Sequence, residues 1–292
     1  MPARAPPANM HLARLAVTGL VTQPANALVA WNPRLALDLP LLVVLFFHGQ
    51  EPDPQNFAWT DHRLPDQIGA AAKNVVLIAP TMRMTKPVKG DVICDYLATP
   101  DSIVTLLREG VAAVARQLGG TGDAAWIARA VAGAGVHLVP YSNGYRAWAA
   151  IVKTLRAPPP PGIALPPVIG HSAFDCLYWS SPLMDGVDCH APAANARFSA
   201  NGKALLDRAF VTTHFTEGNE TLVRQATYLD VMIAHETALH AHPNLPVRLG
   251  PGDIARTVAA TDKHLQAVSA DSNLSRVVAA APGFDLSARP SV

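Results

Sequence analysis

Hydrophobic residues gather in short continuous runs along the chain, with polar or helical stretches between them. Residues 41–47 form an unbroken apolar run, and residues 74–79, 136–139 and 168–170 are mostly apolar. Residues 209–215 form a further strand-like segment, with alternation at its end. Runs of this length without polar positions are typical of strands that are buried on both faces of a parallel sheet. The pattern therefore predicts a set of central, buried strands, of which 209–215 is the last clear one.

Between these strands the apolar residues recur at helical spacing. We expect helices over residues 64–73, 100–118, 126–132, 145–155 and 220–240. Asp101 or Ser102 is expected to cap the helix at 100–118. Strands that alternate with helices predict an α/β fold with a mostly parallel central sheet and helices on both faces. All 292 residues are assigned to one domain, with residues 177–204 as an irregular excursion that forms a lid or pocket wall.

Composition narrows the class of protein. Half of the residues are hydrophobic, 15% are charged, and the formal net charge is +1. A charge this close to zero, without a run of Lys or Arg, argues against nucleic acid as the main partner. The longest apolar run, residues 39–47, is far shorter than the roughly 20 residues of a membrane span. We therefore expect a compact globular protein whose main partner is neither nucleic acid nor an anionic membrane, while its oligomeric state is not fixed by the sequence.

The cysteines and the first residues bear on location. Cys94, Cys176 and Cys189 leave at least one thiol unpaired. The N-terminal residues lack the apolar segment and small-residue cleavage site of a signal peptide. We expect a cytoplasmic protein with three reduced thiols, and a Cys176–Cys189 disulfide is the alternative for an exported one.

The stretch Pro140-Tyr141-Ser142-Asn143-Gly144 joins a predicted strand to a predicted helix. A serine on a sharp strand-to-helix turn resembles the nucleophile elbow G-x-S-x-G of the α/β-hydrolase superfamily, with proline in place of the first glycine. The resemblance implies the α/β-hydrolase fold and a nucleophilic serine at the top of the sheet. The alternative is a simple Asn-Gly turn, but that would require a second strand where a helix is expected.

The resemblance also implies a base and an acid that follow the serine along the chain. His264 fits the base best, because it lies late in the chain just before a short helical stretch. The acid has two candidates, Asp175 after the strand 168–170 and Glu217 after the strand 209–215. Asp175 is preferred for its apolar surroundings, and Glu217 remains the alternative.

The match to the superfamily is closest at Phe46-Phe47-His48-Gly49-Gln50, an apolar strand followed by His-Gly. Gly49 lets the backbone turn sharply. The backbone N–H of Gln50, together with that of Asn143, is then expected to form an oxyanion hole. His48 is expected to support this loop by hydrogen bonding.

A rival motif lies near the end of the predicted helix 220–240. His235, Glu236 and His240 resemble the zinc motif H-E-x-x-H, but the histidines are five residues apart rather than four, so they do not share one helix face. We interpret them as surface residues and expect no metal and no cofactor.

The expected function is hydrolysis of a carboxylic ester, or a related acyl bond, through an acyl-enzyme on Ser142. Tyr141, Trp59 and Trp179 are predicted to line the substrate pocket. The alternatives are an acyltransferase, in which an alcohol replaces water, and an inactive hydrolase fold that serves as a binding module.

Overall fold

The computed structural model describes residues 6–21, 25–86, 90–120, 123–156, 161, 163–177, 182–185, 197–198, 200–236, 239–241, 248–259, 261 and 263–286. The strands are β1 (Met10–Ala13), β2 (Ala27–Trp31), β3 (Leu42–Phe47), β4 (Val75–Pro80), β5 (Gly135–Pro140), β6 (Val168–Phe174), β7 (Met184–Asp185), β8 (Arg197–Phe198), β9 (Phe210–Thr216), β10 (Leu239–Ala241) and β11 (Ile254–Ala259). The α-helices are α1 (Pro54–Thr60), α2 (Leu64–Ala70), α3 (Pro100–Gln117), α4 (Ala124–Ala132), α5 (Tyr145–Arg156), α6 (Ala200–Leu206), α7 (Glu220–Glu236) and α8 (Asn273–Ala280).

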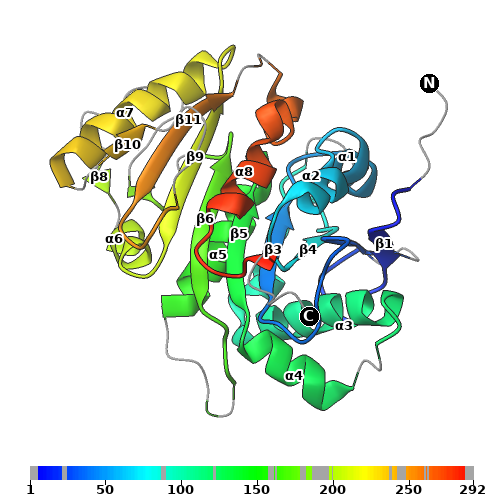
Figure 1. Ribbon diagram of the computed structural model, residues 1–292. Helices are drawn as coiled ribbons and strands as arrows, with labels where there is room; N and C mark the ends of the chain where they lie inside the picture. Colours follow the sequence, from blue (N-terminus) through cyan, green and yellow to red (C-terminus); the bar gives the residue numbers. More distant parts are fainter. Residues whose placement is uncertain are drawn as a thin grey trace.

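Within the described residues, nine strands form one twisted sheet in the order β1-β2-β4-β3-β5-β6-β9-β11-β10 (Figure 1). The pairs β1–β2 and β2–β4 are antiparallel, and all the other neighbouring pairs are parallel. The predicted parallel sheet is therefore confirmed. β3 and β5 lie at its centre, where both of their faces are covered.

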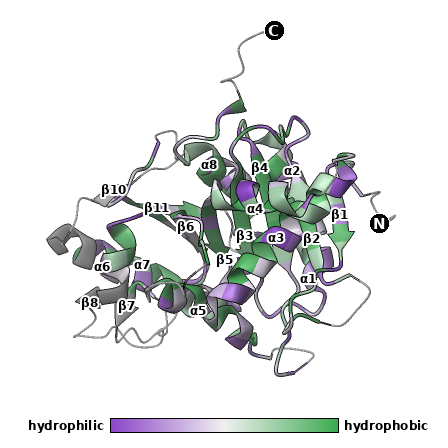
Figure 2. Ribbon diagram, turned by 90° about the horizontal axis from the view of Figure 1, so that it is seen from below, coloured by the Kyte–Doolittle hydropathy of each residue, from purple (hydrophilic) through white to green (hydrophobic). Residues whose placement is uncertain are grey.

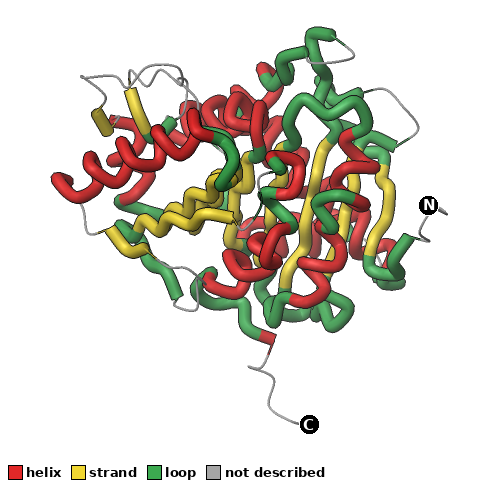
Figure 3. Tube along the Cα trace, turned by 90° about the horizontal axis from the view of Figure 1, so that it is seen from above, coloured by secondary structure: helices red, strands yellow, loops and turns green. Residues whose placement is uncertain are grey.

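The sheet separates two hydrophobic clusters, as the alternation of side chains along β3 shows. Val43, Leu45 and Phe47 enter one cluster, whereas Leu42, Val44 and Phe46 enter the other. Helices α3, α4, α5, α6 and α7 contribute to the first cluster, and α1, α2 and α8 to the second. Figure 3 shows the strands lying between helices, and Figure 2 shows that hydrophobic colour dominates the strands at the centre of the sheet. Successive side chains of one strand therefore pack into the hydrophobic clusters on opposite faces of the sheet.

Several elements differ from the sequence-based expectations. β1, β2 and β11 were not predicted, and β11 now supplies the strand that precedes His264. The helix expected over 220–240 ends at Glu236, and His240 lies in β10. His240 is therefore not a helix-surface residue, because the chain there extends to pair with β11 at the edge of the sheet. The cap of α3 is Thr99 rather than Asp101 or Ser102, since Pro100 occupies the first helical position.

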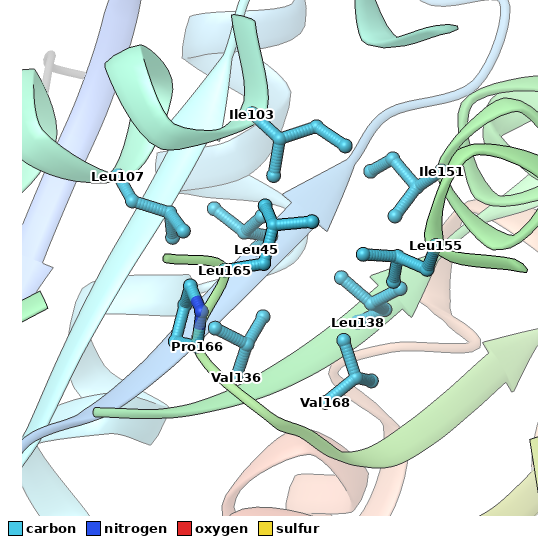
Figure 4. A pocket seen from close by; sticks show the side chains of 10 residues that line it. All are labelled: Leu45, Ile103, Leu107, Val136, Leu138, Ile151, Leu155, Leu165, Pro166 and Val168. Carbon is cyan, nitrogen blue, oxygen red and sulfur yellow. The ribbon is translucent and has the colours of Figure 1, made fainter. Parts of the chain in front are cut away.

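The first hydrophobic cluster contains a small gap. Apolar side chains of β3, β5, β6, α3 and α5 point toward a common small gap (Figure 4). Its lining is Leu45, Ile103, Leu107, Val136, Leu138, Ile151, Leu155, Leu165, Pro166 and Val168. This gap belongs to the core and lacks polar groups that could orient a substrate.

In the described part of the chain, no helix has the length and apolarity needed to cross a membrane.

A buried lysine ties the segment after α8 to the amino end of β4. Lys73 is 2% exposed, and its Nζ donates to Ala281 O at 2.6 Å, Gly283 O at 2.8 Å and Asp285 Oδ1 at 2.8 Å. The other carboxylate oxygen of Asp285 accepts from Arg248 at 2.9 Å. All three protons of the ammonium group are used, which is what makes its burial tolerable.

We expect Lys73→Met to lower the free energy of unfolding by roughly 2–4 kcal/mol, because the carbonyls of Ala281 and Gly283 and the carboxylate of Asp285 lose a charged donor. Urea titration followed by circular dichroism measures this. The control is Arg224→Met, which removes an exposed ion pair with Glu220 and should cost less than about 0.5 kcal/mol. Equal effects of the two substitutions would contradict the assignment.

A second polar feature runs through the interior, where a hydrogen-bonded row crosses β5, β6, β9 and β11. His137 Nε2 bonds Ser172 Oγ at 2.8 Å, Thr212 donates to Ser172 at 2.6 Å, and His214 contacts both Thr212 and Thr257. On the opposite face of β6, His171 Nδ1 accepts from Trp148 Nε1 at 2.8 Å. Burial lowers the pKa of His137, His171 and His214 to about 3 each, so these rings stay neutral.

These three histidines predict a loss of stability in acid. The unfolded chain binds protons below the ordinary histidine pKa of about 6.5, whereas the folded chain does not until about pH 3. The free energy of unfolding should therefore fall from pH 6.5 toward pH 3, by up to about 1.4 kcal/mol per pH unit for each histidine. Urea titrations at a series of pH values measure the slope. His171→Gln should reduce this slope by the contribution of one histidine. A free energy of unfolding that does not change between about pH 6.5 and 4.5 would refute the interpretation.

Candidate active site

The predicted site residues meet at the carboxyl edge of the parallel strands. Gly49 follows β3, Ser142 follows β5, Asp175 follows β6, and His264 comes after β11. In sheets of this type, loops at the carboxyl ends of neighbouring strands form the ligand site. The order of strands along the sheet therefore gathers residues that are up to 215 positions apart in the chain.

Ser142 lies on a sharp turn between β5 and α5, within a single 3₁₀ turn (Ser142–Gly144). Its φ is +50°, a left-handed backbone conformation that is uncommon outside glycine and is typical of a strained nucleophile elbow. Gly144 is required here, because a Cβ on it would lie 2.2 Å from Phe47 O. Pro140 is the last residue of β5 and pairs with Phe47, where the extended backbone suits its fixed φ. The elbow therefore forms with proline in place of the first glycine.

Ser142, His264 and Asp175 form one hydrogen-bonded chain. Ser142 Oγ lies 2.8 Å from His264 Nε2, and His264 Nδ1 lies 3.0 Å from Asp175 Oδ2. A carboxylate only accepts hydrogen bonds, so Nδ1 carries the proton and Nε2 is left to accept from the serine hydroxyl. The side chain of His264 is 34% exposed, whereas that of Asp175 is fully buried. The imidazole thus bridges a buried carboxylate and a group that a ligand can reach.

Asp175 is held rigidly from the neighbouring strand. Thr216, at the end of β9, donates its backbone N–H to Asp175 Oδ1 at 2.9 Å and its hydroxyl to Oδ2 at 2.8 Å. The backbone N–H of Asp175 donates to His214 O at 2.8 Å. Glu217, the other candidate acid, is exposed, and its backbone N–H bonds Thr261 O. Of the two candidates, the structure brings Asp175 to His264.

Tyr141 has a different place from the one expected of a pocket residue. It is 1% exposed, its ring stacks on that of His264 with centroids 5.0 Å apart, and its hydroxyl donates to His264 O at 3.0 Å. The expectation that Tyr141 lines a substrate pocket is therefore corrected: its ring is buried by packing. Its ring and hydroxyl contacts position His264.

The loop after β3 is fixed through His48. The Nδ1–H of His48 donates to Gly49 O at 2.7 Å, while Nε2 accepts the Met82 N–H at 2.9 Å. Burial lowers the pKa of His48, so the ring is neutral, as this pattern of bonds requires. The carbonyl of Gly49 and the N–H of Gln50 belong to one trans peptide and point in opposite directions. Holding the oxygen therefore fixes the direction of the Gln50 N–H.

Gly49 also approaches the serine closely. A Cβ on Gly49 would lie 2.7 Å from Ser142 Cβ and 3.1 Å from Ser142 Oγ. On the other side of the elbow, Asn143 Oδ1 accepts the Val92 N–H at 2.9 Å, and its Nδ2 lies 3.4 Å from Asp91 Oδ1. Arg146 pairs with the same carboxylate at 3.0 Å. Both loops that flank Ser142 are thus anchored by side chains.

The other residues singled out in the sequence are Gln50, the two tryptophans predicted to line the pocket, and the cysteines. The side chain of Gln50 is exposed, so only its backbone N–H can serve the predicted role. Trp59 lies in α1, packed at the edge of the second hydrophobic cluster, and stays a predicted pocket residue. Trp179 and Cys189 lie outside the described residues. Cys176 is buried and free, and burial raises the pKa of its thiol well above the usual range.

Three supporting residues were missed or only half-assigned by sequence reasoning. Thr216 stands beside the candidate Glu217 in the sequence, and nothing in a lone threonine marks it as the partner of a distant aspartate. Tyr141 was assigned to a pocket. His48 was expected to support its loop, and its bond to Gly49 O now shows how it does so.

No protein-family model and no curated protein sequence matches the chain. Among solved structures, a mutant feruloyl esterase module from Clostridium thermocellum complexed with sinapinate is similar at 13% identity and a TM-score of 0.48, with 96% of this chain and 92% of that chain covered. An inhibited esterase B from Lactobacillus rhamnosis is similar at 10% identity and a TM-score of 0.47, covering 93% and 85%.

An α/β serine hydrolase without a lid from Xanthomonas campestris is similar at 11% identity and a TM-score of 0.37, with 90% and 91% covered. At these identities and TM-scores the assignment of fold depends on the chain's own features. A mostly parallel sheet, with a serine on a left-handed turn between β5 and α5, gives the α/β-hydrolase fold.

The two candidate acids predict different outcomes on substitution. Asp175→Asn should reduce kcat for p-nitrophenyl butyrate by roughly 10³–10⁴-fold, because the amide cannot hold the Nδ1–H tautomer of His264. Glu217→Gln, the matched control just after β9, should change kcat less than about twofold. Steady-state assays of the two folded variants test this. A large loss in Glu217→Gln with a small one in Asp175→Asn would reverse the assignment.

Proposed function

We propose that the chain is a serine hydrolase that cleaves a carboxylic ester, or a related acyl bond, through a covalent acyl-enzyme. The observation that carries the proposal is the hydrogen-bonded chain of Ser142, His264 and Asp175 on a strained elbow. A serine hydroxyl is a weak nucleophile at its free pKa, and such a chain is the arrangement that activates it.

In the first half of the reaction, Ser142 Oγ attacks the substrate carbonyl carbon as His264 Nε2 takes the hydroxyl proton. Asp175 keeps the imidazole in the required tautomer and stabilises the imidazolium that forms. The two bonds from Thr216 leave the carboxylate fixed in direction. His264 then gives the proton to the leaving alcohol as the C–O bond breaks, which leaves the acyl group on Ser142.

The negative oxygen of the tetrahedral intermediate needs donors that are already in place. We assign this role to the backbone N–H groups of Gln50 and Asn143. The bond from His48 to Gly49 O and the close approach of Gly49 to Ser142 support the first assignment. The bond from Val92 to the Asn143 side chain supports the second.

In the second half, water attacks the acyl carbon while His264 takes one of its protons. The bond between the acyl carbon and Ser142 Oγ then breaks, the carboxylic acid leaves, and His264 returns the proton to Oγ. Nucleophile, base and oxyanion donors all come from the chain, so the proposed cycle requires no cofactor. The substrate is a small acyl compound. A second alcohol in place of water would make the same site an acyltransferase, and assays that add an acceptor alcohol distinguish the two.

The proposal predicts that a fluorophosphonate probe modifies Ser142. Intact-mass and peptide mass spectrometry should show one adduct on this serine, because its hydroxyl is the activated nucleophile. Ser142→Ala should remove both the adduct and the hydrolysis of p-nitrophenyl butyrate, with an unchanged circular dichroism spectrum.

The matched control is Ser172→Ala, which removes a serine buried in β6 and should leave the labelling in place. His264→Ala should slow labelling by several orders of magnitude. A folded protein that neither reacts with the probe nor hydrolyses esters would overturn the proposal and favour a binding module.

A further inference from the structure

A buried acid–histidine pair lies beside the candidate site and has no part in the proposed reaction steps. Glu51 is 2% exposed and His62 is fully buried, and Glu51 Oε1 lies 2.9 Å from His62 Nε2. Glu51 lies in the loop between β3 and α1, whereas His62 lies between α1 and α2. The pair thus joins two segments on the second face of the sheet.

The pair is incompletely satisfied. Among the described residues, Glu51 Oε2 and His62 Nδ1 are buried atoms without a hydrogen-bond partner. A buried pair of this kind is weak as a source of stability, because desolvation opposes the attraction between its members. Apolar residues of similar volume would often serve the fold equally well. A role in geometry accounts better for the presence of these side chains.

On one side, the pair reaches the proposed oxyanion loop. Glu51 is the residue after Gln50, so an inward-facing, fixed Glu51 limits how the Gln50 peptide can move. Its Oε2 lies 3.7 Å from His48 Nδ1, the atom that donates to Gly49 O. Glu51 therefore sits behind the histidine that sets the direction of the proposed oxyanion donor.

On the other side, the pair reaches the segment that carries the base. The His62 ring meets the Tyr141 ring edge-on at 4.6 Å, and Tyr141 in turn stacks on His264. A second connection runs through Gln67, whose Nε2 donates to His62 O at 2.7 Å and to Val268 O at 3.2 Å. Val268 lies four residues after His264.

We propose that the Glu51–His62 pair is a positioning device, which couples the oxyanion loop to the segment bearing His264 and so holds both at the distance that the reaction needs. The inference rests on the proposed function. Glu51 and His62 act through His48 and Tyr141 and do not themselves touch the substrate.

The test replaces the pair by apolar residues of similar volume in the double variant Glu51→Met/His62→Leu. Such a replacement is expected to leave the fold as stable as before, or more stable. The kcat for p-nitrophenyl butyrate should nevertheless fall about 10- to 100-fold, with KM changed less than threefold, because misplacement of a donor or base by about 1 Å affects the transition state most.

Single variants and a stability control complete the design. Glu51→Ala should lose kcat to a similar extent, while Glu51→Gln, which keeps a hydrogen bond to His62, should recover kcat to within about threefold of the wild type. Lys73→Met lowers stability at the opposite end of the sheet and should leave kcat unchanged. Each variant is also titrated with urea, so that activity and stability are compared directly.

A folded double variant with wild-type kcat would overturn the inference, as would a kcat that simply follows the free energy of unfolding across all variants, Lys73→Met included. A double variant that does not fold would also count against it, because the pair would then be a structural requirement. The proposed function is tested separately, by labelling of the wild type with the fluorophosphonate. Failure of that labelling rejects the reaction itself, whereas normal labelling with unaffected pair variants rejects only the positioning role.

Discussion

The close packing of the β3 loop against the elbow after β5 is the constraint on which the candidate site depends. β3 and β5 pair in parallel up to Phe47 and Pro140, so the residues that follow them emerge side by side. Phe47 O then excludes any side chain at residue 144, and Ser142 excludes any at residue 49. Two glycines therefore let Ser142 and the proposed oxyanion loop meet without a gap, and the other candidate-site residues are arranged around that contact.

The central fold was predictable from the sequence because buried strands of a parallel sheet are apolar along their whole length. β3, β4 and β5 were found in this way, and each is fully buried. β11 was missed because it mixes Arg256 and Thr257 with its apolar residues, and one of its sides faces α7, where Arg256 pairs with Asp230. Only the three-dimensional neighbours explain such a pattern. β2, a run of five apolar residues, carried a signal of the same kind as β3.

The site was predictable only as far as residue type and chain order suffice. Ser142, His264 and the loop at Gly49 follow from the elbow and from the order of the motifs. The choice between Asp175 and Glu217 does not, because it depends on the left-handed backbone of Asp175 and on two bonds from Thr216. Likewise, Tyr141 is an aromatic residue next to Ser142 in the sequence, yet its ring is buried against that of His264. Side-chain direction is set by tertiary packing and leaves no mark on the local sequence.

Strained backbone and unsatisfied buried polar atoms both occur at the candidate site, whereas Lys73 at the amino edge of the sheet is fully satisfied. Ser142 and Asp175 hold positive φ angles, and Glu51 and His62 keep buried atoms without partners among the described residues. At the opposite edge, Lys73 uses every proton of its ammonium group. Backbone strain persists only where the surrounding structure over-determines it. The pairing of β3 with β5 and the two bonds from Thr216 to Asp175 are the surrounding structure that holds Ser142 and Asp175 in these conformations.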